Sequence, residues 1–182
     1  ENFTYFGMNA FYQAAISFTS QNMGAGKLKR IHRIVLTATG CAAVTGLIFG
    51  SLSCLFGRQL LSIYSPQEVV VEEGIKRLFY IAAPYFICGI MDTMAGVIRG
   101  LGYSILPMIV SLLGACVLRI IWIQAFCSLP AFHYVENVYV SYPVTWTITL
   151  TAHIICYLII MRRLKKRPEM QEAQSAAWIH SE

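Results

Sequence analysis

Residues 34–56 read IVLTATGCAAVTGLIFGSLSCLF and contain no charged side chain. A helix rises about 1.5 Å per residue, so about 20 apolar residues suffice to cross the roughly 30 Å of hydrocarbon in a bilayer. The whole chain agrees with this reading, because 57% of its residues are hydrophobic and 13% are charged. Soluble domains carry about 25% charged residues. The sequence therefore predicts an integral membrane protein.

Four further segments resemble this one in length and apolar character. Helices are expected, because a helix satisfies its own backbone hydrogen bonds in lipid and the apolar runs lack the alternation of membrane strands. We expect an all-α fold, a polytopic transmembrane bundle within residues 1–167, followed by a polar cytoplasmic tail at 168–182. The expected spans are 3–22, 34–56, 78–98, 104–127 and 139–161. The first is the least apolar of the five.

Lysine and arginine residues indicate the orientation. Ten of them follow spans one, three and five, whereas the connections on the other side carry Arg58, Lys76 and Arg77. Such an excess is typical of the cytoplasmic side, so we expect a multi-pass protein of the cell membrane with a cytoplasmic C-terminus. The net charge of +5 then reflects topology and contact with lipid. Nucleic acid is not an expected partner.

Two of the expected spans carry a polar stripe in which the residues recur every four positions. The stripe of span one is Tyr5, Asn9, Gln13, Ser17 and Gln21, and that of span five is Ser141, Thr145, Thr149, His153 and Tyr157. A four-residue step places such residues on one helix face. A polar face is expected either to pack against other helices or to line a wet cavity, and the pattern leaves both alternatives open.

Asp92 is the only acidic residue inside an expected span, and Arg119 is the only basic one. A carboxylate at a helix centre costs about 2.5–3.5 kcal/mol to insert, so its environment must offset this cost. Gly89, Gly96 and Arg99 follow or precede it at three- and four-residue steps, and Gly96-x-x-x-Gly100 allows a close helix contact. Asp92 is therefore expected to point into the bundle.

Two interpretations of Asp92 compete. It could form a structural ion pair with Arg119, or it could bind and release a proton or cation on a transport route. On antiparallel helices the two residues are expected at different depths, which favours the transport role for Asp92. Arg119 is then a candidate for lining the cavity together with Tyr5, Asn9, Gln13, Ser17, Thr145, Thr149 and His153.

Other features argue against a metal site or an enzyme. The six cysteines lie in apolar spans with no C-x-x-C spacing, so neither a zinc nor a redox site is expected. No nucleophile and base pair occurs outside the apolar spans, so no enzyme is expected. We expect no cofactor except a proton or sodium ion. Pro84, Pro107 and Pro143 predict bent helices.

Three segments of the chain stand out in order, namely FYQAAISFTSQNMGAGKLKRIHR at 11–33, GVIRGLGYSILPMIV at 96–110 and VSYPVTWTITLTAHIICYLIIMRR at 140–163. They resemble parts of the multidrug and toxic compound extrusion (MATE) transporters. The first is similar to the eighth helix of that family, the second to the turn between the tenth and eleventh helices, and the third to the last helix. The resemblance covers residues 3–167. It implies the second six-helix lobe of a twelve-helix antiporter without its first helix, and a missing N-terminal lobe as partner.

The resemblance also implies an activity, namely the export of organic cations or other drugs in exchange for protons or sodium. Asp92 corresponds to a carboxylate implicated in ion coupling in that family, and the aromatic rings of Tyr5, Phe11, Tyr12 and Phe18 are candidates for binding a cationic substrate. Two alternatives remain. One is a flippase for lipid-linked oligosaccharides, which is expected to need further cationic side chains besides Arg119. The other is a membrane scaffold without transport activity.

Overall fold

A computed structural model describes residues 2–64, 67–127 and 135–166 of the chain. Within these ranges the protein is all-helical and contains no strand, as the sequence predicts. The helices are α1 (Asn2–Gly24), α2 (Leu28–Leu55), α3 (Gly57–Tyr64), α4 (Glu68–Ala82), α5 (Tyr85–Gly100), α6 (Ile105–Ser111), a π-helical turn η1 (Leu112–Val117), α7 (Leu118–Cys127) and α8 (Val135–Lys165). The expected cytoplasmic tail at 168–182 lies outside the described residues.

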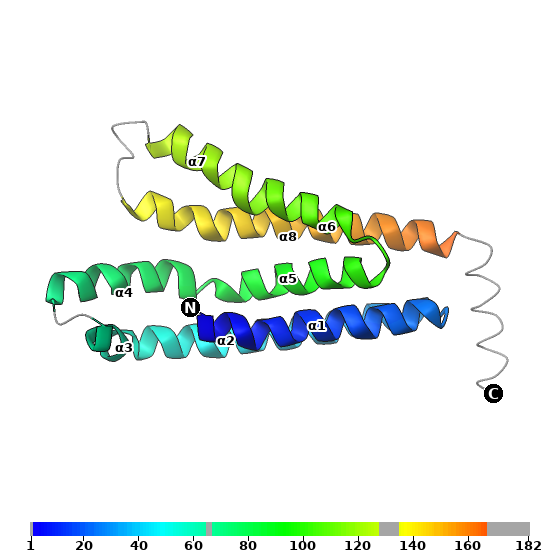
Figure 1. Cartoon of the computed structure of the whole chain (residues 1–182), viewed down its shortest axis with the longest axis horizontal. Coiled ribbons are helices and arrows are strands. Elements are labelled where there is room, and N and C mark those ends of the chain that lie inside the picture. The colour runs from blue at the N-terminus through cyan, green and yellow to red at the C-terminus, as the bar shows by residue number, and fades with distance from the viewer. Residues whose placement is uncertain (1, 65–66, 128–134, 167–182) are drawn as a thin grey trace.

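The long helices run side by side along one axis (Figure 1). The α1–α2 turn, the α5–α6 turn and the end of α8 all lie at the same end of the bundle, which we call the basic end (Figure 1). Both turns use a glycine with positive φ, Gly26 at 69° and Gly102 at 93°, a conformation that other residues rarely adopt. The tertiary structure thus gathers at one end the segments that carry most of the Lys and Arg residues.

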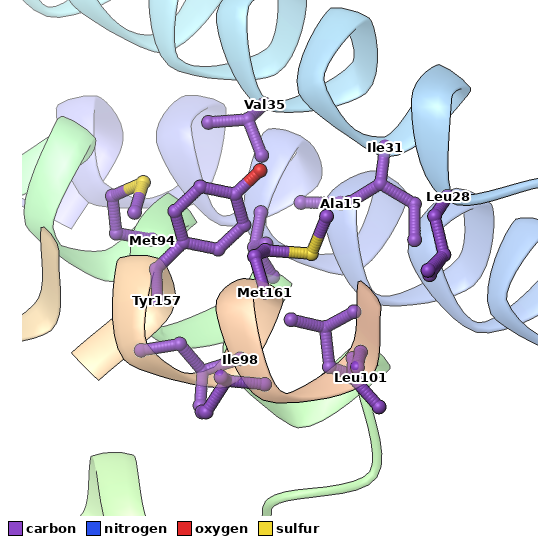
Figure 2. Close-up of a cluster of buried hydrophobic side chains, with 12 residues drawn as sticks. Ala15, Leu28, Ile31, Val35, Met94, Ile98, Leu101, Tyr157 and Met161 are labelled. Atoms are coloured by element: carbon purple, nitrogen blue, oxygen red, sulfur yellow. The ribbon is translucent and has the colours of Figure 1, made fainter. Parts of the chain in front are cut away.

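Helix α5 lies between α1, α2 and α8, and the largest buried cluster forms where these four helices meet near the basic end (Figures 1 and 2). Figure 2 shows Tyr157 and Met161 of α8 among Ile31 and Val35 of α2. The cluster contains Ala15, Leu28, Ile31, Val35, Met94, Val97, Ile98, Leu101, Tyr157, Ile160, Met161 and Leu164. Many large apolar side chains point outward instead, Ile63 being 80% exposed, and such an outer surface suits a lipid environment.

Three single helical stretches are long and apolar enough to cross a membrane, namely Leu28–Leu55, Ile105–Phe126 and Glu136–Lys165. The bent pair α4–α5 gives a fourth. The expected span 3–22 corresponds to α1, which is 23 residues long but is not among the candidates in the described part of the chain. Its polar stripe lowers its hydropathy. A helical membrane bundle is therefore found, with three or four spans by length and composition where the sequence predicted five.

The expected helix 78–98 is two helices in the structure. Helix α4 ends at Ala82, α5 begins at Tyr85, and the two are bent by 43°. Pro84 lies at the break, where its missing backbone N–H interrupts the helical hydrogen bonds, so the bend predicted there is confirmed. Helix α8 continues through Pro143.

The expected helix 104–127 is continuous but not uniform, since the π-helical turn η1 separates α6 from α7. Gly114 is the buried residue of this turn. A Cβ atom at Gly114 would overlap the side chain of Thr149 on α8, so the glycine allows the two helices to approach.

Candidate functional site

Asp92 lies in the middle of α5 and is half-buried. In the described part of the chain, no hydrogen bond or ion pair involves its carboxylate. Tyr5 of α1 and Cys88, one helical turn earlier on α5, lie near the carboxylate. The carboxylate is thus neither fully exposed nor neutralised by a neighbouring side chain.

Glycines bring α1 directly against α5 on either side of Asp92. A Cβ atom at Gly89 would lie 2.5 Å from the Met8 sulfur, and one at Gly100 would lie 2.8 Å from the Ile16 carbonyl oxygen. The close helix approach predicted from the glycine spacing is therefore confirmed. It places Asp92 at the edge of the α1–α5 interface.

Arg99 is the basic residue in the last turn of α5, the helix that carries Asp92. It follows Asp92 by seven residues, so both lie on the same side of α5, about 10 Å apart along the helix axis. The Arg99 guanidinium donates a hydrogen bond to the Tyr12 hydroxyl, and its central carbon lies 5.7 Å from the centre of the Tyr12 ring. Arg99 is thus held against α1 rather than paired with Asp92.

The polar stripe of α1 lies on the outside of the described bundle. Tyr5 is 45% exposed, Asn9 is half-buried, and Gln13, Ser17 and Gln21 are exposed. The opposite side of the helix carries the buried residues, which are Met8, Ala15 and Thr19. Because Tyr5 lies at the Asp92 end of the stripe, the carboxylate adjoins a row of polar groups that no described helix covers.

The polar stripe of α8 has the opposite placement. Ser141, Thr145, Thr149, His153 and Tyr157 are all buried. Several bond their own helix, with Thr149 donating to the Thr145 carbonyl at 2.6 Å and Thr145 to the Tyr142 carbonyl at 3.1 Å. In this structure Thr145, Thr149 and His153 are buried between helices.

Two members of the α8 stripe reach other helices. His153 Nε2 lies 3.5 Å from the Pro107 carbonyl oxygen on α6, and the Tyr157 hydroxyl lies 2.9 Å from His32 Nδ1 on α2. His32 did not stand out in the sequence, because it lies among basic residues next to the α1–α2 turn. Only the tertiary structure brings it to Tyr157.

Arg119 is engaged away from Asp92. Its guanidinium donates a hydrogen bond to the Thr145 hydroxyl at 3.2 Å, and its central carbon lies 3.8 Å from the centre of the Tyr142 ring. The alternative in which Arg119 neutralises Asp92 therefore does not occur in the described structure. Arg119 instead links α7 to α8.

The described residues contain no group of three or more His, Cys, Asp or Glu side chains that could hold a metal ion. The aromatic candidates for binding a cation are divided by the fold. Tyr12 contacts Arg99, whereas Phe11 and Phe18 line a groove between α1 and α2, on another side of α1 from the polar stripe. Tyr5 is the aromatic residue of this set that lies near Asp92.

Comparison with known proteins gives one family. Searches of curated proteins and of solved structures found no match to this chain. The model of the MatE family matches residues 1–123, a segment that includes the polar stripe of α1, Asp92 and Arg119. This match covers well over half of the chain and agrees with the resemblance of its segments to MATE transporters. The chain belongs to the MatE family of membrane transporters.

Proposed function

We propose that this protein takes part in secondary active efflux, exporting small organic cations or other drugs across the cell membrane in exchange for protons or sodium. Asp92 is the residue that binds the coupling ion. The observation that carries the proposal is the half-buried Asp92 carboxylate, which has no hydrogen bond or ion pair in the described chain. A desolvated, unpaired carboxylate is costly, and it is relieved by binding a proton or a metal cation.

The surroundings of Asp92 support this role. The carboxylate adjoins the outward polar stripe of α1, which provides oxygen and amide groups along a path toward the basic end. Tyr5, at the start of that stripe, offers an aromatic face and a hydroxyl to a cationic substrate. The ion and the substrate compete for the charge of Asp92. The ion favours one conformation of the transporter and the substrate favours the other, which is the basis of exchange.

The orientation follows from the charge distribution. The excess of Lys and Arg supports a proposed orientation in which the basic end and the C-terminus face the cytoplasm and the α3–α4 end faces outside. The other transporter lobe is proposed to lie against the polar stripe of α1, which would otherwise face lipid.

The experiment is coupled transport by Asp92→Asn in the full-length protein, reconstituted into proteoliposomes with a fluorescent organic cation. Proton and sodium gradients are imposed separately. The variant keeps the size of the side chain and removes its charge, so gradient-driven export is expected to fall at least about tenfold, the effect of losing roughly 1.4 kcal/mol of ion binding. Unchanged coupled export by Asp92→Asn would rule out the proposed role.

A matched control is Glu72→Gln, which removes an exposed carboxylate from α4, away from the α1–α5 interface. Export by this variant is expected to equal that of the wild type. Movement of lipid-linked oligosaccharide in place of the cation would favour the flippase alternative. A flippase is expected to need several cationic side chains. Arg119 is the one basic residue of this chain within the expected spans, and it already contacts Thr145 and Tyr142, so the flippase alternative has little support.

A further inference from the structure

A groove of about 420 Å³ opens between α1 and α2 on the outer surface of the bundle. Phe11, Ala14 and Phe18 line it from α1, and Arg33, Ala38 and Cys41 are among the residues that line it from α2. The α2 residues from Arg33 to Cys41 cover about 12 Å of helix, so the groove is much shorter than the roughly 30 Å hydrocarbon layer. Its walls are apolar except at the Arg33 end.

Arg33 marks the end of the groove that is nearer to the basic end. Its side chain is exposed, and no ion pair with a carboxylate involves it in the described chain. Lys29 and Arg30 precede it by four and three residues, and both are exposed, so the three cations share one face of the first turns of α2. Arg33 presents a planar set of N–H donors that matches a phosphate.

We propose that this groove binds an anionic phospholipid, with one acyl chain between α1 and α2 and the phosphate at Arg33. The occupant must be apolar along about two helical turns and anionic at the Arg33 end, and an anionic lipid has both properties. An apolar helix in this position would leave Arg33 without an anionic partner, whereas a lipid phosphate supplies one. A symmetric second copy would bring the same cationic face against itself, which is unfavourable.

The lipid site is separate from the proposed transport site. Phe11 and Phe18 lie on a different side of α1 from Tyr5, Asn9 and Gln13, and Arg33 is on α2 rather than α5. A lipid in this groove would contact α1 and α2 together. It would therefore stabilise their packing independently of Asp92.

The test is native mass spectrometry of the purified full chain with equal amounts of phosphatidylglycerol and phosphatidylcholine. The wild type is expected to retain one phosphatidylglycerol in preference to phosphatidylcholine. Arg33→Gln is expected to lower retention of phosphatidylglycerol about fivefold, the effect of one basic contact with an anionic lipid, and to leave phosphatidylcholine unchanged. Arg163→Gln is the matched control, because it removes an exposed arginine from the same end of the bundle but outside the groove.

A second variant, Ala38→Trp, fills the apolar part of the groove and is expected to reduce retention of phosphatidylglycerol while Arg33 remains. Because a large side chain can disturb folding, the exposed Arg33→Gln variant carries the test. Equal losses for Arg33→Gln and Arg163→Gln would mean attraction to the basic end in general and would overturn the proposal. Equal retention of both lipids by the wild type would also overturn the proposal. So would a wild-type dimer that is lost in the Ala38→Trp variant.

Discussion

Gly96 of α5 lies so close to α1 that a Cβ atom there would stand 2.9 Å from the carbonyl oxygen of Tyr12. This contact is one helical turn beyond Asp92. It packs the helix that carries the candidate carboxylate against α1, while no ion pair in the described chain involves Asp92 itself. The same Tyr12 accepts the hydrogen bond from Arg99, so one residue of α1 holds both the backbone and the basic side chain of α5.

Gly96→Ala is expected to destabilise the protein by about 1–3 kcal/mol, because the added methyl group forces α1 and α5 apart. The measurement is the thermal unfolding temperature of the purified protein in detergent. Gly40→Ala is the matched control, since a Cβ atom at Gly40 meets nothing within 4 Å. That change is expected to leave the unfolding temperature unchanged or to raise it, because alanine favours helix. Equal unfolding temperatures for the two variants would contradict the proposed packing role.

Gly114→Ala is expected to lower stability by a similar amount of about 1–3 kcal/mol, because the new methyl group overlaps Thr149. Thr149→Ala removes the obstructing atoms, so the double variant is expected to lose less stability than the two single variants added together. A coupling of about 0.5–3 kcal/mol is typical of residues in direct contact. Strict additivity in denaturation of the four proteins would show that η1 and α8 do not meet at these residues.

Tyr157→Phe removes the hydroxyl that lies 2.9 Å from His32 Nδ1 and leaves the ring in place. We expect a loss of about 0.5–1.5 kcal/mol, the usual net contribution of one hydrogen bond. Tyr139→Phe is the control, since Tyr139 is half-buried and makes no hydrogen bond in the described chain. The comparison is made by thermal unfolding, and an equal change in both variants would argue against the link between α8 and α2.

Gln13→Leu tests whether the polar stripe of α1 serves transport. Gln13 is exposed, so the substitution is expected to leave the free energy of unfolding within about 0.5 kcal/mol of the wild type. If the stripe lines the transport route, export by the full-length protein is expected to fall severalfold. Ser51→Leu makes a comparable change at an exposed position of α2 and is expected to have no effect on export. Normal export by Gln13→Leu would indicate that the stripe only packs against another helix.

Much of the fold was predictable from composition and spacing. Long apolar runs predicted a helical membrane bundle, and the glycine spacing around Asp92 predicted the close approach of another helix, which proves to be α1. The break at Pro84 was predicted as a kink, but its 43° angle was not, because the missing N–H of a proline does not by itself specify how far the chain turns. The π-helical turn at Leu112–Val117 was not predicted, and neither was the contact of its Gly114 with Thr149 on another helix.

The two polar stripes show where the sequence could not distinguish alternatives. Both recur every four residues, yet the structure leaves the α1 stripe outside and buries the α8 stripe. Periodicity identifies which residues share a helix face but not what that face contacts. Likewise, the sequence left an ion pair between Asp92 and Arg119 open, and the structure engages Arg119 with Thr145 and Tyr142.

The sequence by itself determined the membrane environment and the helical class, because hydrocarbon admits only chains that satisfy their own backbone hydrogen bonds. The tertiary structure decided which polar groups stay without a partner and which are buried in helix packing. Glycine contacts set α1 beside Asp92 and left the carboxylate without a partner, while the α8 stripe was used in packing. These outcomes depend on contacts between residues far apart in the chain, which local spacing does not specify.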